Sequence, residues 1–414
     1  MAHIEPFKGL RPPAPIAPRV ASPPYDVINS EEARDMARDN DVSFLHITKP
    51  EIDLPAGTDP YADAVYRKAA DNYARFRKEG ILVQDPERYF YLYKQVWGEH
   101  TQVGLVAGAS AADYQADIIK KHEHTREEKE KDRMRHIETL SANTGPVFLT
   151  FKQNPEIDGL FGKAMTIPAE YDFTSADGVR HVFHVISDPQ LIRDIRTAFG
   201  RLETLYVADG HHRSASATAV KVQREKQNPR HTGDEEYNFF LSVIFPHNQM
   251  KILPYNRVVR APDGFCKAEF FHRISEFFSY DDTGDQTPSR PREFCLYIGG
   301  KWYTLKARDG SHDPHHPVAS LDVSILQERI LGPVLGITDP RRDRRIDFVG
   351  GIRGTAVLEK RVDDGHFTMA FSLHPTTIEQ LFRVADSGNV MPPKSTWFEP
   401  KLKSGLVVHS LEDE

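Results

Sequence analysis

Apolar and polar residues alternate in several stretches of the chain and recur at helical spacing in others. Residues 88–114 alternate on both sides of Gly98, which predicts a β-hairpin. Residues 169–187 predict a second hairpin that turns at Asp177-Gly178. We expect helices over residues 30–40, 61–79, 115–143, 189–199 and 211–226. Strands and helices mixed in this way predict an α/β (α+β) protein with a mixed sheet.

The length of the chain leaves room for more than one hydrophobic core. A chain of 414 residues exceeds the size at which a single core usually stops growing. The order of predicted strands and helices also changes near Ala261. We therefore predict two domains, residues 1–260 and residues 261–414.

The composition is that of a globular protein, with 39% hydrophobic and 27% charged residues. No run of about 18 apolar residues occurs, and the first residues lack the apolar segment of a secretory signal. The chain has two cysteines, Cys266 and Cys295, which cannot build a disulfide framework. We expect a cytoplasmic protein without a membrane partner. The formal net charge of -7 argues against general nucleic-acid binding.

The stretch "LYVADGHHRSASATAV", residues 205–220, joins an apolar strand pattern to an alanine-rich helix pattern. A glycine turn at a helix start presents free backbone N–H groups and the positive end of the helix dipole, which together favour phosphate. Gly210 permits close approach of a ligand, and Arg213 can hold two phosphate oxygens. His211 and His212 can donate protons or hydrogen bonds. We predict that these four residues bind nucleotide phosphates.

Asp209 stands directly before this turn, where a carboxylate does not suit contact with an anion. It suits a Mg²⁺ ion or the proton of a substrate hydroxyl. We therefore predict that Asp209 is catalytic and a metal ligand. The alternative is that Asp209 only caps the helix and the histidines are solvated.

A charged pattern fills the predicted helix over residues 115–143. On a helix, one face would carry His122, Arg126, Lys129, Arg133 and His136. That cationic face suits an acidic substrate, with Arg126 and Arg133 holding its phosphate or carboxylate. Glu123 or Asp132 could serve as base or metal ligand. The alternative is a solvated helix with ion pairs four residues apart.

A third candidate follows Pro392-Pro393. Lys394, Ser395 and Thr396 offer one cation and two hydroxyls, a set suited to anchoring phosphate. The segment lacks the glycine spacing of a P-loop. The alternative is an ordinary surface tail.

Asp-Gly-His-His-Arg at a strand-to-helix turn resembles the phosphate-binding turn of the ParB/sulfiredoxin superfamily, whose free serine kinases carry the same five residues. In the sulfiredoxin pattern His211 stands where the nucleophilic cysteine would be, so that redox chemistry is not expected. The resemblance implies a ParB/sulfiredoxin-like nucleotide-binding core with additional N- and C-terminal sections.

A longer resemblance covers nearly the whole chain. The segments similar to the family known as domain of unknown function 1015 are "PFKGLRP", "VASPPYDVI", "FLHITKPEIDLP", "IKKHEHTREEKEKDR", "TGPVFLTF", "ADGHHRSA" and "MPPKSTWFEPKLKSGLVV". The His-Glu-x-Thr-Arg-x-x-Lys-Glu-x-Asp-Arg pattern over residues 122–133 is among the clearest of them. This resemblance favours substrate binding by His122, Arg126, Lys129 and Arg133, with Glu123 catalytic.

These patterns together favour a small-molecule phosphotransferase, in the first place a free serine kinase that uses ATP or ADP with Mg²⁺. Its partners would be a nucleotide and a small anionic or hydroxylated metabolite. Two alternatives stay open, a phosphoserine phosphatase and a ParB-like nucleotide-binding regulatory protein without catalysis. A metal-dependent hydrolase is disfavoured, because the adjacent His211 and His212 would diverge by ~100° at a helix start.

Overall fold

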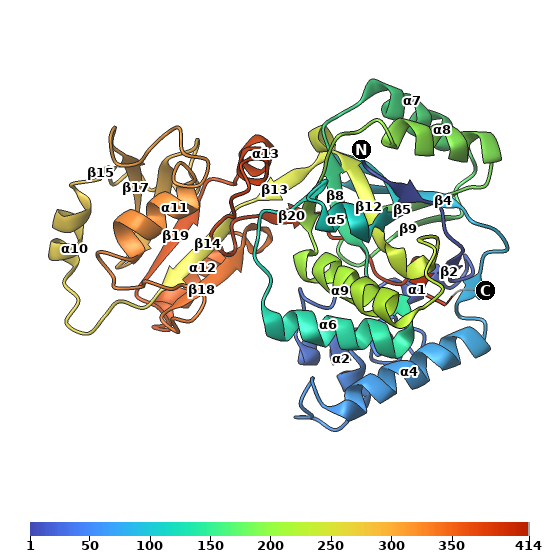
Figure 1. Ribbon diagram of the computed structural model, residues 1–414. Helices are drawn as coiled ribbons and strands as arrows, with labels where there is room; N and C mark the ends of the chain where they lie inside the picture. The colour runs from blue at the N-terminus through green and yellow to red at the C-terminus, as the bar shows by residue number, and fades with distance from the viewer. Residues whose placement is uncertain (413–414) are drawn as a thin grey trace. The chain divides into compact units, whose positions relative to one another are not determined.

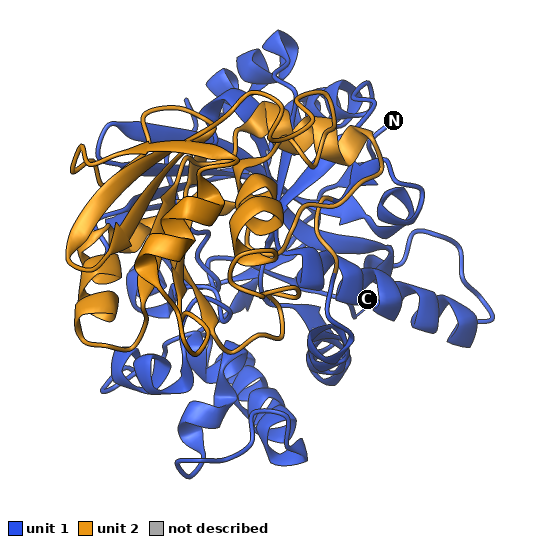
Figure 2. Ribbon diagram, turned by 90° about the vertical axis from the view of Figure 1, so that its left-hand side faces the viewer, with its two compact units in different colours: residues 1–121, 125–250, 400–414 blue, residues 122–124, 251–399 orange. Residues whose placement is uncertain are grey.

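The computed structural model (Figure 1) describes residues 1–412, which form two compact units. Unit 1 comprises residues 1–121, 125–250 and the chain from Pro400 onward. Unit 2 comprises residues 122–124 and 251–399 (Figure 2). The predicted boundary lay near residue 261, whereas the chain enters unit 2 at residue 251 and returns to unit 1 at residue 400.

Unit 1 is built around a nine-stranded sheet. Its strands follow, in sheet order, as β6 (Ile119–Lys120), β11 (Leu205–Asp209), β8 (Val147–Phe151), β12 (Phe239–Pro246), β5 (His100–Ser110), β4 (Phe90–Trp97), β10 (Arg180–Ile186) and β9 (Tyr171–Thr174), with β1 (Ile4–Glu5) paired to β5. β11 runs parallel to β6 and β12 parallel to β8, while the other neighbours are antiparallel. The predicted α/β class with a mixed sheet is confirmed, as are both predicted hairpins, β4–β5 and β9–β10.

Helices cover this sheet and extend beyond it (Figure 1). They are α1 (Ala17–Val20), α2 (Ser30–Met36), α3 (Leu45–Thr48), α4 (Asp63–Lys78), α5 (Ala111–Gln115), α6 (Glu127–Leu140), α7 (Pro155–Ala164), α8 (Pro189–Phe199) and α9 (His211–Gln227). The helices predicted over residues 61–79, 189–199 and 211–226 are confirmed as α4, α8 and α9. α6 packs against both α9 and α4.

The single long helix predicted over residues 115–143 is wrong. α5 ends at Gln115, and Ile119–Lys120 then pairs with β11 as an edge strand. A new helix begins only at Glu127, where three glutamates in the first turn complement the positive end of the helix dipole. The residues from 115 to 143 contain neither glycine nor proline. They are nevertheless divided, because Ile119–Lys120 pairs with the sheet and the glutamates favour a helix start at Glu127.

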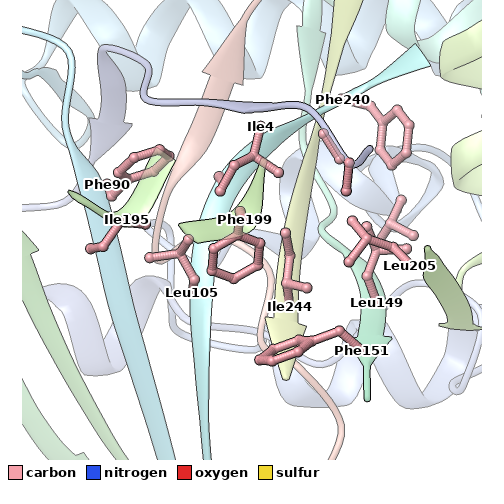
Figure 3. Close-up of a cluster of buried hydrophobic side chains, with 14 of the residues drawn as sticks. Ile4, Phe90, Leu105, Leu149, Phe151, Ile195, Phe199, Leu205, Phe240 and Ile244 are labelled. Atoms are coloured by element: carbon pink, nitrogen blue, oxygen red, sulfur yellow. The ribbon is translucent and has the colours of Figure 1, made fainter. Parts of the chain in front are cut away.

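Apolar side chains of the sheet and helices form one buried cluster (Figure 3). Phe240 and Ile244 project from the same face of β12, because they are four residues apart on a strand. Phe199 of α8 contacts Phe151 of β8 with ring centroids 5.4 Å apart. This cluster fixes α8 and α9 against the sheet and so positions the turn that precedes α9.

A small sheet ties the C-terminal segment into unit 1. Its order is β3 (Val83–Gln84), β2 (Gly9–Arg11), β21 (Val408–Ser410) and β7 (Ala142–Asn143). Gly405 precedes β21 with a φ of +87°, and a Cβ there would lie 2.7 Å from Phe44. The last part of the described chain is thus an integral part of unit 1.

Unit 2 holds an antiparallel six-stranded sheet. Its strands, in sheet order, are β15 (Phe278–Asp281), β17 (Lys301–Ala307), β16 (Glu293–Ile298), β19 (Met369–Leu373), β14 (Tyr255–Val259) and β18 (Ile346–Gly350). A separate ribbon pairs β13 (Lys251–Leu253) with β20 (Trp397–Glu399). The helices are α10 (Lys267–Ile274), α11 (Asp322–Leu326), α12 (Ala356–Asp363) and α13 (Ile378–Asp386). No helix within residues 1–412 is both long and apolar enough to span a membrane.

Phe199→Ala should lower the free energy of unfolding by about 3–5 kcal/mol, because a fully buried aromatic ring is replaced by a cavity. Denaturant unfolding followed by circular dichroism measures this change. The control is Met165→Ala, since Met165 is 40% exposed and its truncation should cost less than about 1 kcal/mol. Equal losses in the two variants would contradict the assignment of this cluster as the core of unit 1.

Candidate functional site

The strand-to-helix turn predicted around Gly210 is present in unit 1. β11 ends at Asp209, and α9 begins at His211. Gly210 adopts a φ of +98°, a conformation that other residues rarely take, and a Cβ there would lie 3.3 Å from the Arg213 guanidinium. The N-cap of α9 is Gly210 and not Asp209, so the alternative in which Asp209 caps the helix is wrong.

Arg213 is a buried cation, and its partners do not occupy all of its N–H donors. Its side chain is 9% exposed, and Nη1 donates a hydrogen bond to the carbonyl oxygen of Pro146. Nη2 lies 3.4 Å from an Asp26 carboxylate oxygen and 3.7 Å from one of Asp209. Nε is buried without a hydrogen-bond partner in the described chain. These long ion pairs and the unused donor leave the guanidinium able to bind an anion.

Asp209 is held by a second cation from the C-terminal segment. Lys401 Nζ donates to Asp209 Oδ2 at 2.9 Å. Burial opposes ionisation of this carboxyl, but the charges of Lys401 and Arg213 outweigh it and keep the pKa of Asp209 well below its usual range. Asp209 is therefore an anion at neutral pH, and the Gln95 side chain fixes Lys401 further by donating to its carbonyl oxygen.

Arg133 of α6 is the second cation of this region. Its side chain is 14% exposed, and Nε and Nη2 donate to one oxygen of Asp132 at 2.8 and 2.7 Å. The other Asp132 oxygen accepts from the Tyr66 hydroxyl at 2.6 Å. The guanidinium carbon lies 4.1 Å from the centre of the Tyr25 ring, a cation–π contact. Arg133 is thereby clamped between a ring and a carboxylate.

Arg133 and Arg213 line the same pocket. The pocket is small and partly open to solvent. It is lined by Pro24, Tyr25, Thr48, Arg133, His136, Ile137, Asn143, Thr144, Gly145, Arg213 and Ser404. The structure thus brings one predicted phosphate-binding residue together with one predicted substrate-binding residue.

The other residues of the predicted cationic face occupy different positions. Arg126 precedes α6 and is exposed, and its backbone N–H donates to His212 Nε2 at 3.0 Å. Lys129 is on α6 and contacts the hydroxyl of Tyr61. His122 also precedes α6, so the predicted face that joined His122 and Arg126 to Arg133 is wrong. Elsewhere on α6 the exposed pair Glu127–Lys131 matches the alternative of a solvated ion-paired surface.

His122 and Glu123 belong to unit 2 rather than to unit 1. The carbonyl oxygen of His122 accepts from the backbone N–H of Met391 at 2.8 Å. Met391 directly precedes Pro392-Pro393, so His122 lies beside the segment that carries Lys394, Ser395 and Thr396. Two predicted patches that are 270 residues apart along the chain, His122 and Pro392, therefore meet in unit 2.

Lys394 sits in a tight turn in this segment with a φ of +59°. Its carbonyl oxygen accepts from Arg257 Nη2 at 3.0 Å. The Ser395 hydroxyl donates to the carbonyl oxygen of Pro392 at 2.5 Å, so its proton is used within the turn. Arg257 is 3% exposed and contacts carbonyl groups and the Phe348 ring but no carboxylate of the described chain. Burial lowers the pKa of Arg257 to about 10.

The described residues do not build a metal centre. Within residues 1–412, no three His, Cys, Asp or Glu side chains are grouped to hold a metal ion. Asp209, the predicted Mg²⁺ ligand, is engaged by Lys401 and Arg213. These cations compete with a metal for the carboxylate, so we derive no step through Mg²⁺, and its involvement stays a prediction.

Comparison with known proteins places the chain in a family. The sequence profile described as "Protein of unknown function (DUF1015)" matches residues 4–324. The chain belongs to this family. The resemblance read from the seven DUF1015-like segments is therefore confirmed. No curated protein matches the chain significantly.

Several solved structures resemble this DUF1015 member weakly. A free serine kinase in complex with AMP has 13% identity and a TM-score of 0.36, covering 70% of this chain and 89% of its own. SbnI with C-terminal truncation from Staphylococcus aureus has 11% identity and a TM-score of 0.40, with coverages of 75% and 90%. A conserved hypothetical protein from Pyrococcus furiosus has 13% identity and a TM-score of 0.35, with coverages of 70% and 93%. Likeness at this level carries no conclusion about activity.

Sequence reasoning did not select several residues that surround the two arginines. These are Tyr25, Asp26, Asn143, Thr144, Lys401 and Ser404. They come from three distant parts of the chain, and only the sheet β3–β2–β21–β7 explains how the C-terminal ones arrive there. The signal that could have found them is their occurrence in the segments "VASPPYDVI", "TGPVFLTF" and "KLKSGLVV", or directly before them, because all three segments belong to the family resemblance.

Asp209→Asn should lower the free energy of unfolding by about 1.5–3 kcal/mol at pH 7, because the charged hydrogen bond to Lys401 is lost. The pKa of Asp209 is lowered on folding, so its stabilising contribution is present above the unfolded value of about 3.9. The difference between wild type and variant should therefore shrink as the pH falls below about 4. Denaturant unfolding at pH 7, 5 and 3 measures it.

The control for this variant is Glu127→Gln, which breaks an ion pair whose side chains are 81% and 71% exposed. That loss should be much smaller than the loss in Asp209→Asn, because solvent screens an exposed helix pair. If Asp209→Asn were as mild as the control at every pH, Asp209 would not depend on Lys401 for its place.

Proposed function

We propose that this protein transfers a phosphoryl group between a nucleotide and a small hydroxylated metabolite, in the first place as a free serine kinase that uses ATP or ADP. The observation that carries this proposal is the pocket in unit 1 in which Arg133 and Arg213 meet beside the turn at Gly210. Phosphoryl transfer depends on positioning and on stabilising the charge of the phosphate oxygens. Two guanidinium groups supply both.

We assign the nucleotide phosphates to the turn from Gly210 to Arg213. The start of α9, a helix of 17 residues, carries the positive end of the helix dipole, and Arg213 adds an unused donor. The likeness of Asp-Gly-His-His-Arg to free serine kinases supports the same assignment. Lys394, Ser395 and Thr396 remain further candidates for phosphate contact. Of the predicted substrate residues, we assign the pocket contact to Arg133.

The proposed transfer also needs a proton acceptor for the substrate hydroxyl. The hydroxyl oxygen attacks the terminal phosphorus, the bond to the nucleotide's bridging oxygen breaks, and the hydroxyl proton passes to a carboxylate. Asp209 is a weak acceptor, because Lys401 and Arg213 lower its pKa. Asp26 is better suited, since its side chain is 37% exposed and its ion pair with Arg213 is 3.4 Å long. We therefore propose Asp26 as the base and Asp209 as the residue that holds Lys401 and Arg213.

The direct test is incubation of the purified protein with ATP or ADP and a metabolite mixture that contains serine, followed by mass spectrometry. A new phosphorylated hydroxy metabolite, with loss of the nucleotide's terminal phosphate, is the expected result. Release of inorganic phosphate from phosphoserine would instead establish the phosphatase. Nucleotide binding without any product would establish the regulatory protein.

Arg213→Ala should weaken nucleotide binding by about 1.5–3 kcal/mol, the value of a charge-assisted hydrogen bond. Isothermal titration calorimetry with ATP and ADP measures it. Arg201→Ala is the matched control, because Arg201 is 61% exposed and pairs only with Glu156 in the described chain. Equal affinities of wild type, variant and control would remove Arg213 from the phosphate site.

Asp26→Asn should lower kcat about 10²-fold or more, which is the lower range of a general base. Nucleotide affinity should stay the same or rise, because a negative charge near Arg213 is removed. Asp172→Asn, in an exposed pair with Arg180, controls for the loss of a surface carboxylate. A contrary outcome would be that Asp26→Asn leaves kcat unchanged, while Asp209→Asn loses activity but keeps its melting temperature. In that case Asp209 would be the proton acceptor.

A further inference from the structure

His136 lies in the pocket but has no role in the proposed transfer. It stands three residues after Arg133 on α6, so both side chains lie on the same side of the helix. His136 is 3% exposed and lines the pocket together with Arg133 and Arg213. A histidine in a pocket that holds two cations needs a reason, because a protonated ring there would add a third positive charge.

The hydrogen bonds of His136 determine which ring nitrogen carries the proton. Nε2 lies 3.0 Å from the carbonyl oxygen of Ile47, and a carbonyl oxygen only accepts. Nε2 is therefore the donor, and Nδ1 of the neutral ring is an acceptor. Burial, together with the charge of Arg133, lowers the pKa of His136 to about 4, so the ring is neutral at physiological pH. Nδ1 makes no hydrogen bond with the described part of the chain.

No group that lines the pocket donates a hydrogen bond to Nδ1 within the described chain. Arg133 and Arg213 are donors only, and their N–H groups suit an anion. The Asn143 amide nitrogen also has no hydrogen-bond partner in the described chain, but this atom is buried. The Thr48 hydroxyl donates to the carbonyl oxygen of Phe44 at 3.3 Å. A ligand that offered only acceptors would satisfy the arginines but leave His136 Nδ1 unpaired.

We propose that His136 is a specificity-determining residue that accepts a hydrogen bond from an ammonium or hydroxyl group of an anionic ligand held by Arg133 and Arg213. The ligand class is a small molecule that carries a carboxylate or phosphate and, a few bonds away, an N–H or O–H donor. This inference rests on the proposed ligand pocket, but it concerns recognition and not phosphoryl transfer. A site that leaves a buried polar group unpaired discriminates strongly against the analogue that lacks the matching group.

The test compares two probes of similar size in calorimetry, each with and without ADP. L-Serine carries a carboxylate, an ammonium and a hydroxyl, whereas propionate carries the carboxylate alone. Wild type should bind L-serine at least tenfold more tightly than propionate. His136→Phe should weaken L-serine binding at least tenfold and change propionate binding less than twofold. His136→Asn, which keeps an acceptor oxygen near the position of Nδ1, should recover part of the L-serine affinity.

A matched control separates recognition from folding. His184 is a buried histidine of unit 1 that also bonds a single backbone carbonyl, that of Ile167 at 2.8 Å, and it does not line the pocket. His184→Phe should therefore match His136→Phe in melting temperature but retain L-serine binding. Equal weakening of both probes by His136→Phe, no weakening of either, or no binding of either probe by wild type would overturn the proposal.

Replacing L-serine by D-glycerate, which has hydroxyl donors but no ammonium, identifies which donor His136 receives. If wild type binds D-glycerate as tightly as L-serine and His136→Phe loses that binding, the donor is the hydroxyl. If D-glycerate binds only as weakly as propionate and His136→Phe does not change this, the donor is the ammonium. Because these measurements score binding, they remain decisive even if the phosphoryl-transfer assay yields no product.

Discussion

The arrangement of unit 1 around its pocket depends on two guanidinium groups. Both stay charged although they are nearly removed from solvent. Arginine does not lose its proton under physiological conditions, so Arg133 and Arg213 require compensation by their surroundings. Asp132 and the Tyr25 ring compensate Arg133, while Asp26 and Asp209 compensate Arg213 at longer range. Asp209 in turn requires Lys401. The N-terminal corner, α6, the start of α9 and the C-terminal segment are thereby drawn to one place by charge.

The same requirement explains why the turn at Gly210 is built as it is. A side chain at this position would press against the Arg213 guanidinium, and the φ of +98° disfavours any residue with a Cβ. Ser214 and Ser216 are fully buried at the start of α9, which lets the helix pack closely on its neighbours. Ser216 also donates to the carbonyl oxygen of Glu130 at 3.0 Å and so links α9 to α6. The two arginines, carried by different helices, keep a fixed separation for that reason.

The local parts of this arrangement could be predicted from the sequence, and the long-range parts could not. The strand, glycine turn and helix over residues 205–227 follow from a short contiguous pattern, as do the hairpins at Gly98 and Gly178. The charged run before Asn143 misled the prediction, because pairing of Ile119 with Leu205 depends on a strand 86 residues away in sequence. Arg133 was recognised as a candidate by its helical spacing, yet its partner Tyr25 gives no periodic signal. His136 shared that spacing, but the carbonyl group of Ile47 determines which of its ring nitrogens carries the proton.

The chain returns to unit 1 at residue 400. A fragment that is cut at a single position in the sequence therefore does not contain one complete unit. The polypeptide passes between the units after residues 121, 124, 250 and 399. The family profile stops at residue 324, inside α11, so a fragment cut there would end within a helix of unit 2. Such a fragment would also lack Lys401, Ser404 and β21, and with them the counter-charge of Asp209 and one wall of the pocket. To produce unit 1 alone, residues 251–399 would instead be replaced by a short linker, and the C-terminal segment would be kept.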